Sequence, residues 1–326
     1  MLKYVFVVVG FFLLLGGAEA MVRGAVGIAE KLRISKMVIG MTVVALGTSA
    51  PEFLVAINAT LSGSSALAIG NLIGSNIANI LLILGVSGLI FPIALNPKTL
   101  TLDGWVLVGG TALFMVLATP GKIELFGGFV LLLFFSGFIY YSYRRGTAGY
   151  LTESNNPGEG DIVDTGKIPK ATLTYWILLF VGFVGLIGGS ELLVEGGVAV
   201  ARAFGVSEAV IGLTIIAFGT SLPELAASAV AAYRKHSDMA LGNIVGSNIF
   251  NIVGIVGVVA LISPVHVPVR VVNFDMIMLA LTTLCLMPFM LGNKVTISRG
   301  VAGFYLVAYL SYILAVVAGI EIFNLG

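Results

Sequence analysis

The chain alternates long uncharged apolar runs with short segments that carry turn residues and charges. Each run approaches or exceeds the roughly 20 apolar residues that a helix needs to cross the ~30 Å hydrocarbon core of a bilayer. The pattern predicts an all-α membrane protein with ten transmembrane helices, at residues 4–22, 37–60, 65–91, 103–120, 124–143, 172–200, 208–232, 239–262, 271–291 and 300–320.

One longer segment, residues 144–170, is polar, contains Gly, Asn and Pro, and carries charges of both signs. It is too short for a globular domain and predicts a solvated connector. The expected organisation is therefore a first five-helix repeat at 1–143, the connector at 144–170 and a second five-helix repeat at 171–326.

The composition excludes several classes of protein. Of the 326 residues, 58% are hydrophobic and only 10% are charged, whereas soluble domains carry about 25% charged residues. A soluble enzyme and a disordered protein are excluded, and a net charge of +1 gives no basic surface for nucleic acid. The single cysteine, Cys285, cannot form an intrachain disulfide.

The basic residues predict the orientation, because Lys and Arg accumulate in cytoplasmic loops. With the N-terminus outside, the cytoplasmic connections hold most of the 17 basic residues: Arg23, Lys31, Arg33, Lys36, Lys98, Arg144, Arg145, Lys167, Lys170, Arg234, Lys235, Lys294 and Arg299. Both termini are therefore expected outside the cell, with the 144–170 connector in the cytoplasm of a multi-pass cell-membrane protein.

The chain repeats itself with a constant offset of 172 residues. VIGMTVVALGTSAPEFL (38–54) matches VIGLTIIAFGTSLPELA (210–226), and LAIGNLIGSNIANILLILG (67–85) matches MALGNIVGSNIFNIVGIVG (239–257). Five spans per repeat is an odd number, so the halves are expected to be inverted, as in many secondary transporters. Lys3 and the run before Ala18-Glu19-Ala20 also resemble a signal peptide, but these residues belong to the repeat.

Two glutamates stand alone in long uncharged stretches. Glu52 is the only charged side chain within 37–97, and its repeat partner Glu224 is the only one within 209–233. A carboxylate at membrane depth costs about 3 kcal/mol on insertion scales. A single one could be a protonated glutamate in a helix–helix hydrogen bond. Two copies in the same polar setting favour an ion site or a wet cavity.

Both glutamates end a Gly-Thr-Ser-x-Pro-Glu motif. Pro51 lacks an N–H and cannot bond the carbonyl of Gly47, so the helix is expected to break there. Such a break is tolerated at membrane depth only beside protein or a water-filled cavity. It is expected to free main-chain carbonyls at residues 45–48, next to the hydroxyls of Thr48 and Ser49. Pro223 and Gly219 repeat the pattern in the second half.

The partner motif, Gly-Asn-x-x-Gly-Ser-Asn-x-x-Asn, places Asn71, Ser75 and Asn79 on one helical face. Gly70 and Gly74 form a small-residue seam that lets another helix approach. These amides and hydroxyls could instead join helices, and this role is expected in part of Asn71, Asn76, Asn243 and Asn248.

Together the motifs supply six to eight oxygen ligands, which is the ligand set of calcium. No cysteine or histidine belongs to the set, which disfavours zinc and copper. Two carboxylates balance one divalent or two monovalent cations, and this equivalence suggests exchange.

The paired GTSAPE and GTSLPE motifs, each followed by a GN-x-x-GSN-x-x-N helix, resemble the two signature repeats of the sodium/calcium exchanger family, in the cation/calcium exchanger superfamily. The resemblance implies a central calcium site at Glu52 and Glu224 with backbone oxygens at Thr48 and Thr220. It also implies flanking sodium sites at Ser49, Ser75, Ser221 and Ser247 and the carbonyls of Ala45 and Ala217, with Asn79 and Asn251 completing the centre.

The resemblance also implies a mechanism and a type. Potassium-cotransporting relatives typically carry an aspartate where this chain has Asn251, which argues against potassium transport. The short connector leaves no room for large regulatory domains, so a compact prokaryotic exchanger is indicated. Alternating access is expected, electrogenic if three sodium ions exchange for one calcium, with spans 4–22 and 172–200 as sliding gates.

Other functions remain open on the sequence alone. They are a proton/calcium exchanger, which typically lacks the serines of the sodium positions, a cation channel and, least favoured, a membrane-embedded enzyme. The expected partners are the transported calcium and sodium ions and the lipid bilayer, with no other cofactor, no nucleic acid and no obligatory protein partner.

Overall fold

The computed structural model describes residues 2–94, 97–155, 172–205, 217–291 and 296–318. Within them, eight helical segments are long and apolar enough to cross a membrane: Leu2–Leu32, Ser65–Ile90, Thr101–Ala118, Leu125–Arg145, Thr172–Ala203, Ser237–Ile262, Val271–Phe289 and Arg299–Val317. A ninth is the bent pair Lys36–Thr48 and Ala50–Leu61. The chain is thus a helical multi-pass membrane protein.

Several of the described spans are built from more than one helical piece. The first half contains α1 (Leu2–Leu32), α2 (Lys36–Ile39), η1 (Gly40–Val44), α3 (Ala45–Thr48), α4 (Ala50–Leu61), α5 (Ser65–Ala78), η2 (Asn79–Ile83), α6 (Leu84–Ile90), α7 (Pro97–Ala118) and α8 (Leu125–Asn155). The second contains α9 (Thr172–Ala203), α11 (Ala217–Gly219), α12 (Leu222–Tyr233), α13 (Ser237–Ile249), η4 (Phe250–Ile255), α14 (Val256–Ile262), η5 (Val271–Asp275), α15 (Met276–Leu291) and α16 (Arg299–Val317). The η segments are π-helical.

Two details of the sequence prediction change. Helix α8 continues to Asn155, so the first part of the predicted 144–170 connector is helical, and residues 156–171 lie outside the described residues. The first part of the predicted span 208–232 also lies outside them, up to residue 216. Only α11 and α12 of that span are described, so the full count of ten spans stays a prediction.

The fold is not purely helical. Strand β1 (Ile93–Ala94) pairs antiparallel with β4 (Thr296–Ile297), and β2 (Lys122–Ile123) pairs with β3 (Val265–His266). Strands of two residues leave no periodic pattern in a sequence, which is why they were missed. Each pair joins one half of the chain to the other, and Ile93, Ile123 and Ile297 are buried within them.

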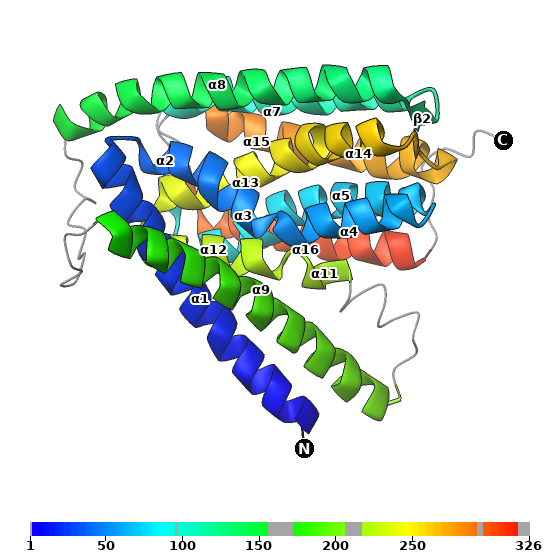
Figure 1. Ribbon diagram of the computed structural model, residues 1–326, viewed down its shortest axis with the longest axis horizontal. Helices are drawn as coiled ribbons and strands as arrows, with labels where there is room; N and C mark the ends of the chain where they lie inside the picture. The colour runs from blue at the N-terminus through cyan, green and yellow to red at the C-terminus, as the bar shows by residue number, and fades with distance from the viewer. Residues whose placement is uncertain (1, 95–96, 156–171, 206–216, 292–295, 319–326) are drawn as a thin grey trace.

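The two halves interlock through their helices as well. Helix α6 of the first half packs against α16 of the second, and α14 of the second packs against α8 of the first. Helices α7 and α15, one from each half, pack together. Figure 1 shows α8 and α7 along one side of the bundle and the helices α1 and α9 on the other.

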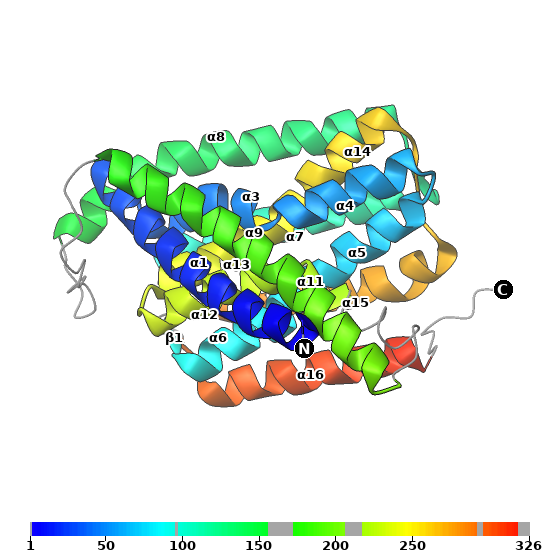
Figure 2. The same ribbon diagram turned by 60° about the horizontal axis from the view of Figure 1, so that its bottom comes forward.

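Helices α1 and α9 lie side by side along their length in both views (Figures 1 and 2). A row of glycines seven residues apart lines each helix, and the two rows are Gly10, Gly17 and Gly24, and Gly182, Gly189 and Gly196. A Cβ atom on Gly17 would lie 2.6 Å from the backbone nitrogen of Leu186. Only glycine permits this approach of the two backbones.

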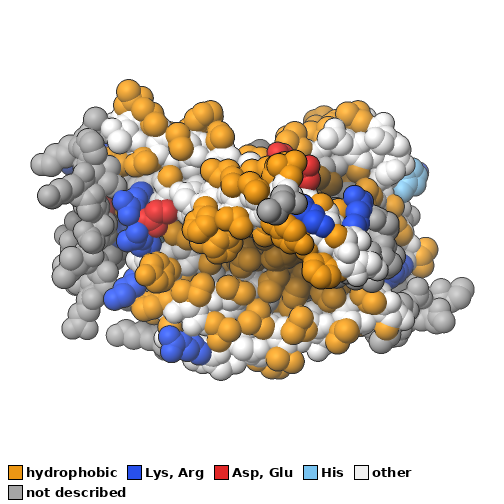
Figure 3. All heavy atoms as spheres, turned by 90° about the horizontal axis from the view of Figure 1, so that it is seen from below, with side chains coloured by type: hydrophobic (Ala, Val, Ile, Leu, Met, Phe, Trp, Pro, Cys, Tyr) orange, Lys and Arg blue, Asp and Glu red, His pale blue; other side chains and the backbone are white. Residues whose placement is uncertain are grey.

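The outer surface is mainly apolar. On the face that carries α1 and α9, hydrophobic side chains are spread over the whole surface, and the few acidic and basic side chains lie in small groups (Figure 3). Side chains such as Phe12, Leu133, Phe180 and Phe304 are more than 60% exposed. Exposed apolar side chains in these numbers suit a surface that faces lipid rather than water.

Candidate ion-binding site

Both signature motifs sit at helix breaks. The axis bends by 45° between Lys36–Thr48 and Ala50–Leu61, and α4 begins with proline in its first turn. Helix α12 also begins with proline in its first turn, after Ser221. The two serines share one backbone conformation, with φ and ψ of −82° and 10° at Ser49 and −85° and 2° at Ser221. The predicted discontinuity is therefore confirmed at both motifs.

One detail of the break differs from expectation. The carbonyl of Ala45 is not freed, because it accepts a hydrogen bond from the amide of Ser49 at 3.0 Å, and the hydroxyl of Thr48 lies 3.4 Å from it. The proline removes the donor four residues after Gly47 and leaves the turn before it intact. Ala217 begins α11 in the second half, and its side chain is not described.

Glu52 and Glu224 lie in the first turns of the helices that follow the breaks, and both are buried, with 0% and 1% of their surface exposed. Their contacts cross between the halves. The hydroxyl of Ser49 donates to Glu224 Oε1 at 2.7 Å, and that of Ser221 lies 3.4 Å from Glu52 Oε1. Ser49 and Ser221 are repeat partners, so each half supplies a hydroxyl to the carboxylate of the other.

Other hydroxyls surround the same carboxylates. Ser75 on α5 donates to Glu52 Oε1 at 3.3 Å and lies 3.1 Å from the hydroxyl of Ser221. The hydroxyl of Thr48 donates to Asn243 Oδ1 at 3.2 Å, and that of Thr220 has no hydrogen-bond partner among the described residues. Ser247, the repeat partner of Ser75, is fully buried on α13.

An amide frame holds the two halves together beside the glutamates. Asn76 donates to the backbone carbonyl of Asn248 at 2.9 Å, and Asn248 donates back to that of Asn76 at 3.3 Å. Asn79 donates to Asn248 Oδ1 at 2.9 Å, and Asn251 donates to Asn76 Oδ1 at 3.0 Å. These bonds confirm that Asn76 and Asn248 join helices.

Asn79 and Asn251 also stand where the helix changes. The π-helical segment η2 begins at Asn79, and Asn251 is the second residue of η4. Single π turns in an α-helix frequently mark functional sites. The sequence contains no pattern that announces a π turn, so this feature was not predicted.

Several buried oxygens of this set have no hydrogen-bond partner among the described residues. They are Glu52 Oε2, Glu224 Oε2, Asn79 Oδ1, Asn251 Oδ1, Thr220 Oγ1 and Ser247 Oγ. An unpaired buried acceptor costs about 1–3 kcal/mol, and more when it is charged. Carboxylate, amide and hydroxyl oxygens are ligands of hard cations, so the chemistry of the residues present fits such an ion.

The charges of the site point the same way. In the described part of the chain, hydroxyl groups contact the carboxylates of Glu52 and Glu224, and no basic side chain does. Buried Asp103 on α7 is different, because Arg145 of α8 lies 2.9 Å from it and balances its charge. Buried carboxylates without a basic partner attract cations.

Sequence reasoning missed Ser228, which supports the second motif from α12. Asn243 on α13, which was expected to join helices, donates to the hydroxyl of Ser228 at 3.0 Å and accepts a hydrogen bond from Thr48 at 3.2 Å. Ser228 lies four residues after Glu224, on the same side of α12. That spacing was the available signal. Asn71, which was also expected to join helices, has an amide nitrogen with no partner among the described residues.

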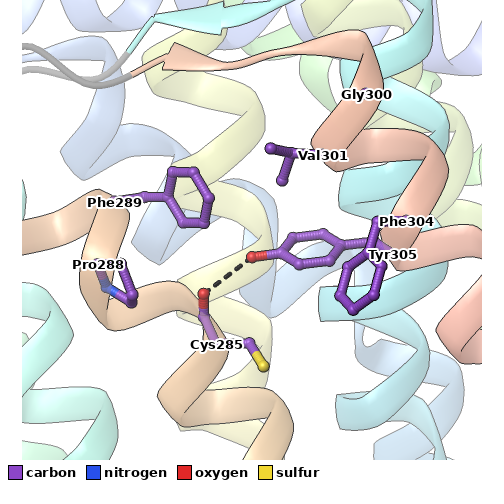
Figure 4. Close-up of a pocket in the computed structure, with 7 residues that line it drawn as sticks. All are labelled: Cys285, Pro288, Phe289, Gly300, Val301, Phe304 and Tyr305. Atoms are coloured by element: carbon purple, nitrogen blue, oxygen red, sulfur yellow. Dashed lines mark hydrogen bonds between the residues drawn. The ribbon is translucent and has the colours of Figure 1, made fainter.

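A pocket elsewhere in the molecule is not an ion site. It lies between α15 and α16, has a volume of about 400 Å³, and is lined by Cys285, Pro288, Phe289, Gly300, Val301, Phe304 and Tyr305 (Figure 4). Its one hydrogen bond among these residues joins the Tyr305 hydroxyl to the Cys285 carbonyl at 2.9 Å. The lining carries no carboxylate, so a cation would have no counter-charge there.

Comparison with known proteins gives consistent results. The family model described as sodium/calcium exchanger protein matches residues 2–144 and 174–318. The chain is 39% identical over 311 residues to the putative antiporter CaxA of Alkalimonas amylolytica, covering 94% of this chain and 96% of that protein. It is 30% identical over 302 residues to the sodium/calcium exchanger MaX1 of Methanosarcina acetivorans, covering 81% and 84%.

A solved structure resembles the whole fold. The sodium-calcium exchanger NCX_Mj, in crystals soaked with 2.5 mM Na⁺ and 0.1 mM Ca²⁺, superposes with a TM-score of 0.83 at 32% sequence identity. The match covers 98% of this chain and 98% of that one.

Proposed function

The chain belongs to the sodium/calcium exchanger family, and from this premise we propose that it exchanges sodium for calcium by alternating access. The observation that carries the proposal is that a serine of each half contacts the glutamate of the other half. The Oε2 atoms of Glu52 and Glu224 have no hydrogen-bond partner among the described residues. Both carboxylates belong to one site that neither half could form alone.

In this proposal calcium lies between the two glutamates. Two carboxylates neutralise one divalent ion, and the backbone oxygens of Thr48 and Thr220 add neutral ligands. The amide oxygens of Asn79 and Asn251 complete a set of hard oxygens, as calcium requires. The unpaired state of both amide oxygens supports their role.

Sodium ions occupy flanking positions that share the same carboxylates. Their ligands are the hydroxyls of Ser49, Ser75, Ser221 and Ser247 and the carbonyls of Ala45 and Ala217. Three of the four serine hydroxyls already lie against a glutamate oxygen. Sodium and calcium then compete for one pair of charges, so each ion set displaces the other. Three sodium ions for one calcium would move one net charge per cycle.

The orientation in the membrane follows from the basic residues. Both termini lie outside and the 144–170 connector lies in the cytoplasm, between repeat units at 1–143 and 171–326. Glu52 and Glu224 then lie in the membrane interior and not at either surface. Positions near the midplane, where inverted repeats meet, are where secondary transporters bind their substrates.

The test is calcium flux in liposomes that contain the purified chain. With the proton gradient collapsed by a protonophore, we expect an outward sodium gradient to drive calcium uptake. Uptake should respond to a potassium-clamped membrane potential, since each cycle moves charge. Calcium flux that ignores sodium but follows an imposed proton gradient would establish the proton/calcium alternative. Flux down a calcium gradient without counterflow would indicate a channel.

A further inference from the structure

One hydrogen bond joins helix α9 directly to the second helix break. The hydroxyl of Ser190 on α9 donates to the backbone carbonyl of Gly219 at 2.8 Å. Ser190 is 6% exposed, and Gly219 is buried. Gly219 ends α11 and directly precedes Thr220, while Ala217 begins the same short helix. The bond therefore holds the Gly219 peptide, which lies between Ala217 and Thr220, and the carbonyls of these two residues are proposed ion ligands.

The Gly219 carbonyl needs a partner because of the motif itself. In a continuous helix it would accept a hydrogen bond from the amide of the residue four positions later. That residue is Pro223, which has no N–H. A buried carbonyl left without a donor is costly, and Ser190 supplies the donor from a different helix. The bond thus compensates the same break that the site requires.

The first half has no equivalent of this bond. The repeat partner of Ser190 is Ala18 on α1, which is fully buried and has no hydroxyl. At Gly47, the repeat partner of Gly219, an added Cβ would instead contact the ring of Phe183 on α9. Helix α9 therefore meets the first break through an apolar ring and the second through a hydrogen bond.

We propose that Ser190 is a positioning residue for ion binding, which couples the place of α9 to the geometry of the Gly219 peptide and so to the ligands at Ala217 and Thr220. The proposal rests on the exchange function proposed above. It assigns to Ser190 no contact with an ion. When α9 moves along the bundle, the hydroxyl leaves Gly219, and the peptide loses the orientation in which its neighbours face the ions.

The bond is suited to breaking and reforming. A serine within a helix has a second acceptor at hand, the backbone carbonyl four residues earlier, which here belongs to Leu186. The hydroxyl can therefore exchange one acceptor for another when α9 moves, without becoming unpaired. Ion binding at the second break and the position of α9 are then linked, and each favours one state of the other.

The test compares the ion dependence of Ser190→Ala with that of the unmodified chain in liposomes. We expect the sodium concentration for half-maximal exchange to rise about tenfold, equivalent to about 1.4 kcal/mol. The corresponding calcium concentration should rise less, because Ala217 belongs only to the sodium set. The maximal rate should stay within about twofold. Ser190→Thr keeps the hydroxyl and should restore the normal sodium dependence, and Ser190→Cys, a weaker donor of similar size, should fall between.

Ser87→Ala is the matched control. Ser87 is a buried serine on α6 whose hydroxyl has no partner among the described residues, so its loss should leave both half-saturating concentrations unchanged. A Ser190→Ala variant that lowers the melting temperature but keeps normal ion dependence would overturn the proposal, since the bond would then be merely structural. Failure of sodium to drive calcium flux in the unmodified chain would instead contradict the exchange function itself.

Discussion

Helices α4 and α12 carry the same motif 172 residues apart but have different surroundings. Helix α12 is covered by α1, and its buried residues include Leu222, Ala227 and Ala231. The apolar cluster that contains α1 and α9 takes in α12 but, among the described residues, no part of α4. Leu54 on α4 is 58% exposed, whereas its repeat partner Ala226 is 4% exposed.

An ion pair reinforces the covered side. Arg234, which follows α12, donates to both carboxylate oxygens of Glu19 on α1, through Nε at 3.0 Å and through Nη2. The repeat partners of these residues are Ser62 and Glu191, which cannot form an ion pair. The repeat is therefore symmetric at the two buried glutamates and asymmetric in what covers them. With Arg234 on the cytoplasmic side, as proposed, α1 covers the cytoplasmic half of the site.

The largest expected effect tests the symmetric part of this comparison. Glu52→Gln and Glu224→Gln should each abolish calcium exchange, by about a hundredfold or more, because a buried ion loses a charge partner worth roughly 3–5 kcal/mol. Flux measurements in liposomes and size-exclusion profiles of the purified variants check this. Glu195→Gln, an exposed glutamate on α9, is the control. Normal exchange in either site variant would refute the shared role of the two halves.

A smaller effect is expected at the seam between α1 and α9. Gly17→Ala places a methyl group against the backbone of Leu186, and overpacking of this kind costs about 1–3 kcal/mol. We expect a melting temperature lower by several degrees and exchange reduced about tenfold. Gly16→Ala is the neighbouring control, since an added Cβ there meets no atom within 4 Å. Gly189→Ala against Gly188→Ala repeats the test in the second half. Equal behaviour of seam and control variants would argue against close backbone contact.

The smallest expected effect tests the asymmetric part of the comparison, the ion pair between α1 and the end of α12. Glu19→Gln removes a partly exposed ion pair worth up to about 1 kcal/mol, so α1 should leave α12 more often. In a Cys285→Ser background, we expect Ala231→Cys on buried α12 to react several-fold faster with a thiol reagent when Glu19→Gln is present. Ser62→Arg, which offers Glu191 a partner in the other half, should also speed this reaction. Unchanged labelling in both variants would show that the ion pair does not bias the two sides.

The sequence predicted the symmetric features and not the asymmetric ones. Proline and glycine chemistry located the breaks before Glu52 and Glu224, and isolation in an apolar stretch singled out both glutamates. The crossed pairing of Ser49 with Glu224 depends on contacts between the halves, which no local pattern encodes. Leu54 is exposed and its repeat partner Ala226 is buried in the described conformation. The two motifs are nearly identical in sequence, so the repeat itself predicts no difference in their exposure. The two-residue strands and the π turns at Asn79 and Asn251 lack a periodic signal.

The glycine rows of α1 and α9 have a consequence for the leakage of ions through the protein without exchange. Two helices whose backbones touch over two heptads are expected to move as one body, so the proposed gating helices α1 and α9 form one moving unit and not two independent gates. In the proposed alternating access, motion of this unit toward α12 is motion away from α4, and the reverse motion covers α4 by uncovering α12. On this proposal, the two sides of the site are not open together while the glycine rows stay in contact. Tight coupling between the sodium and calcium fluxes would then follow from the close backbone contact of α1 and α9 at their glycines. No signal would have to pass between separate gates.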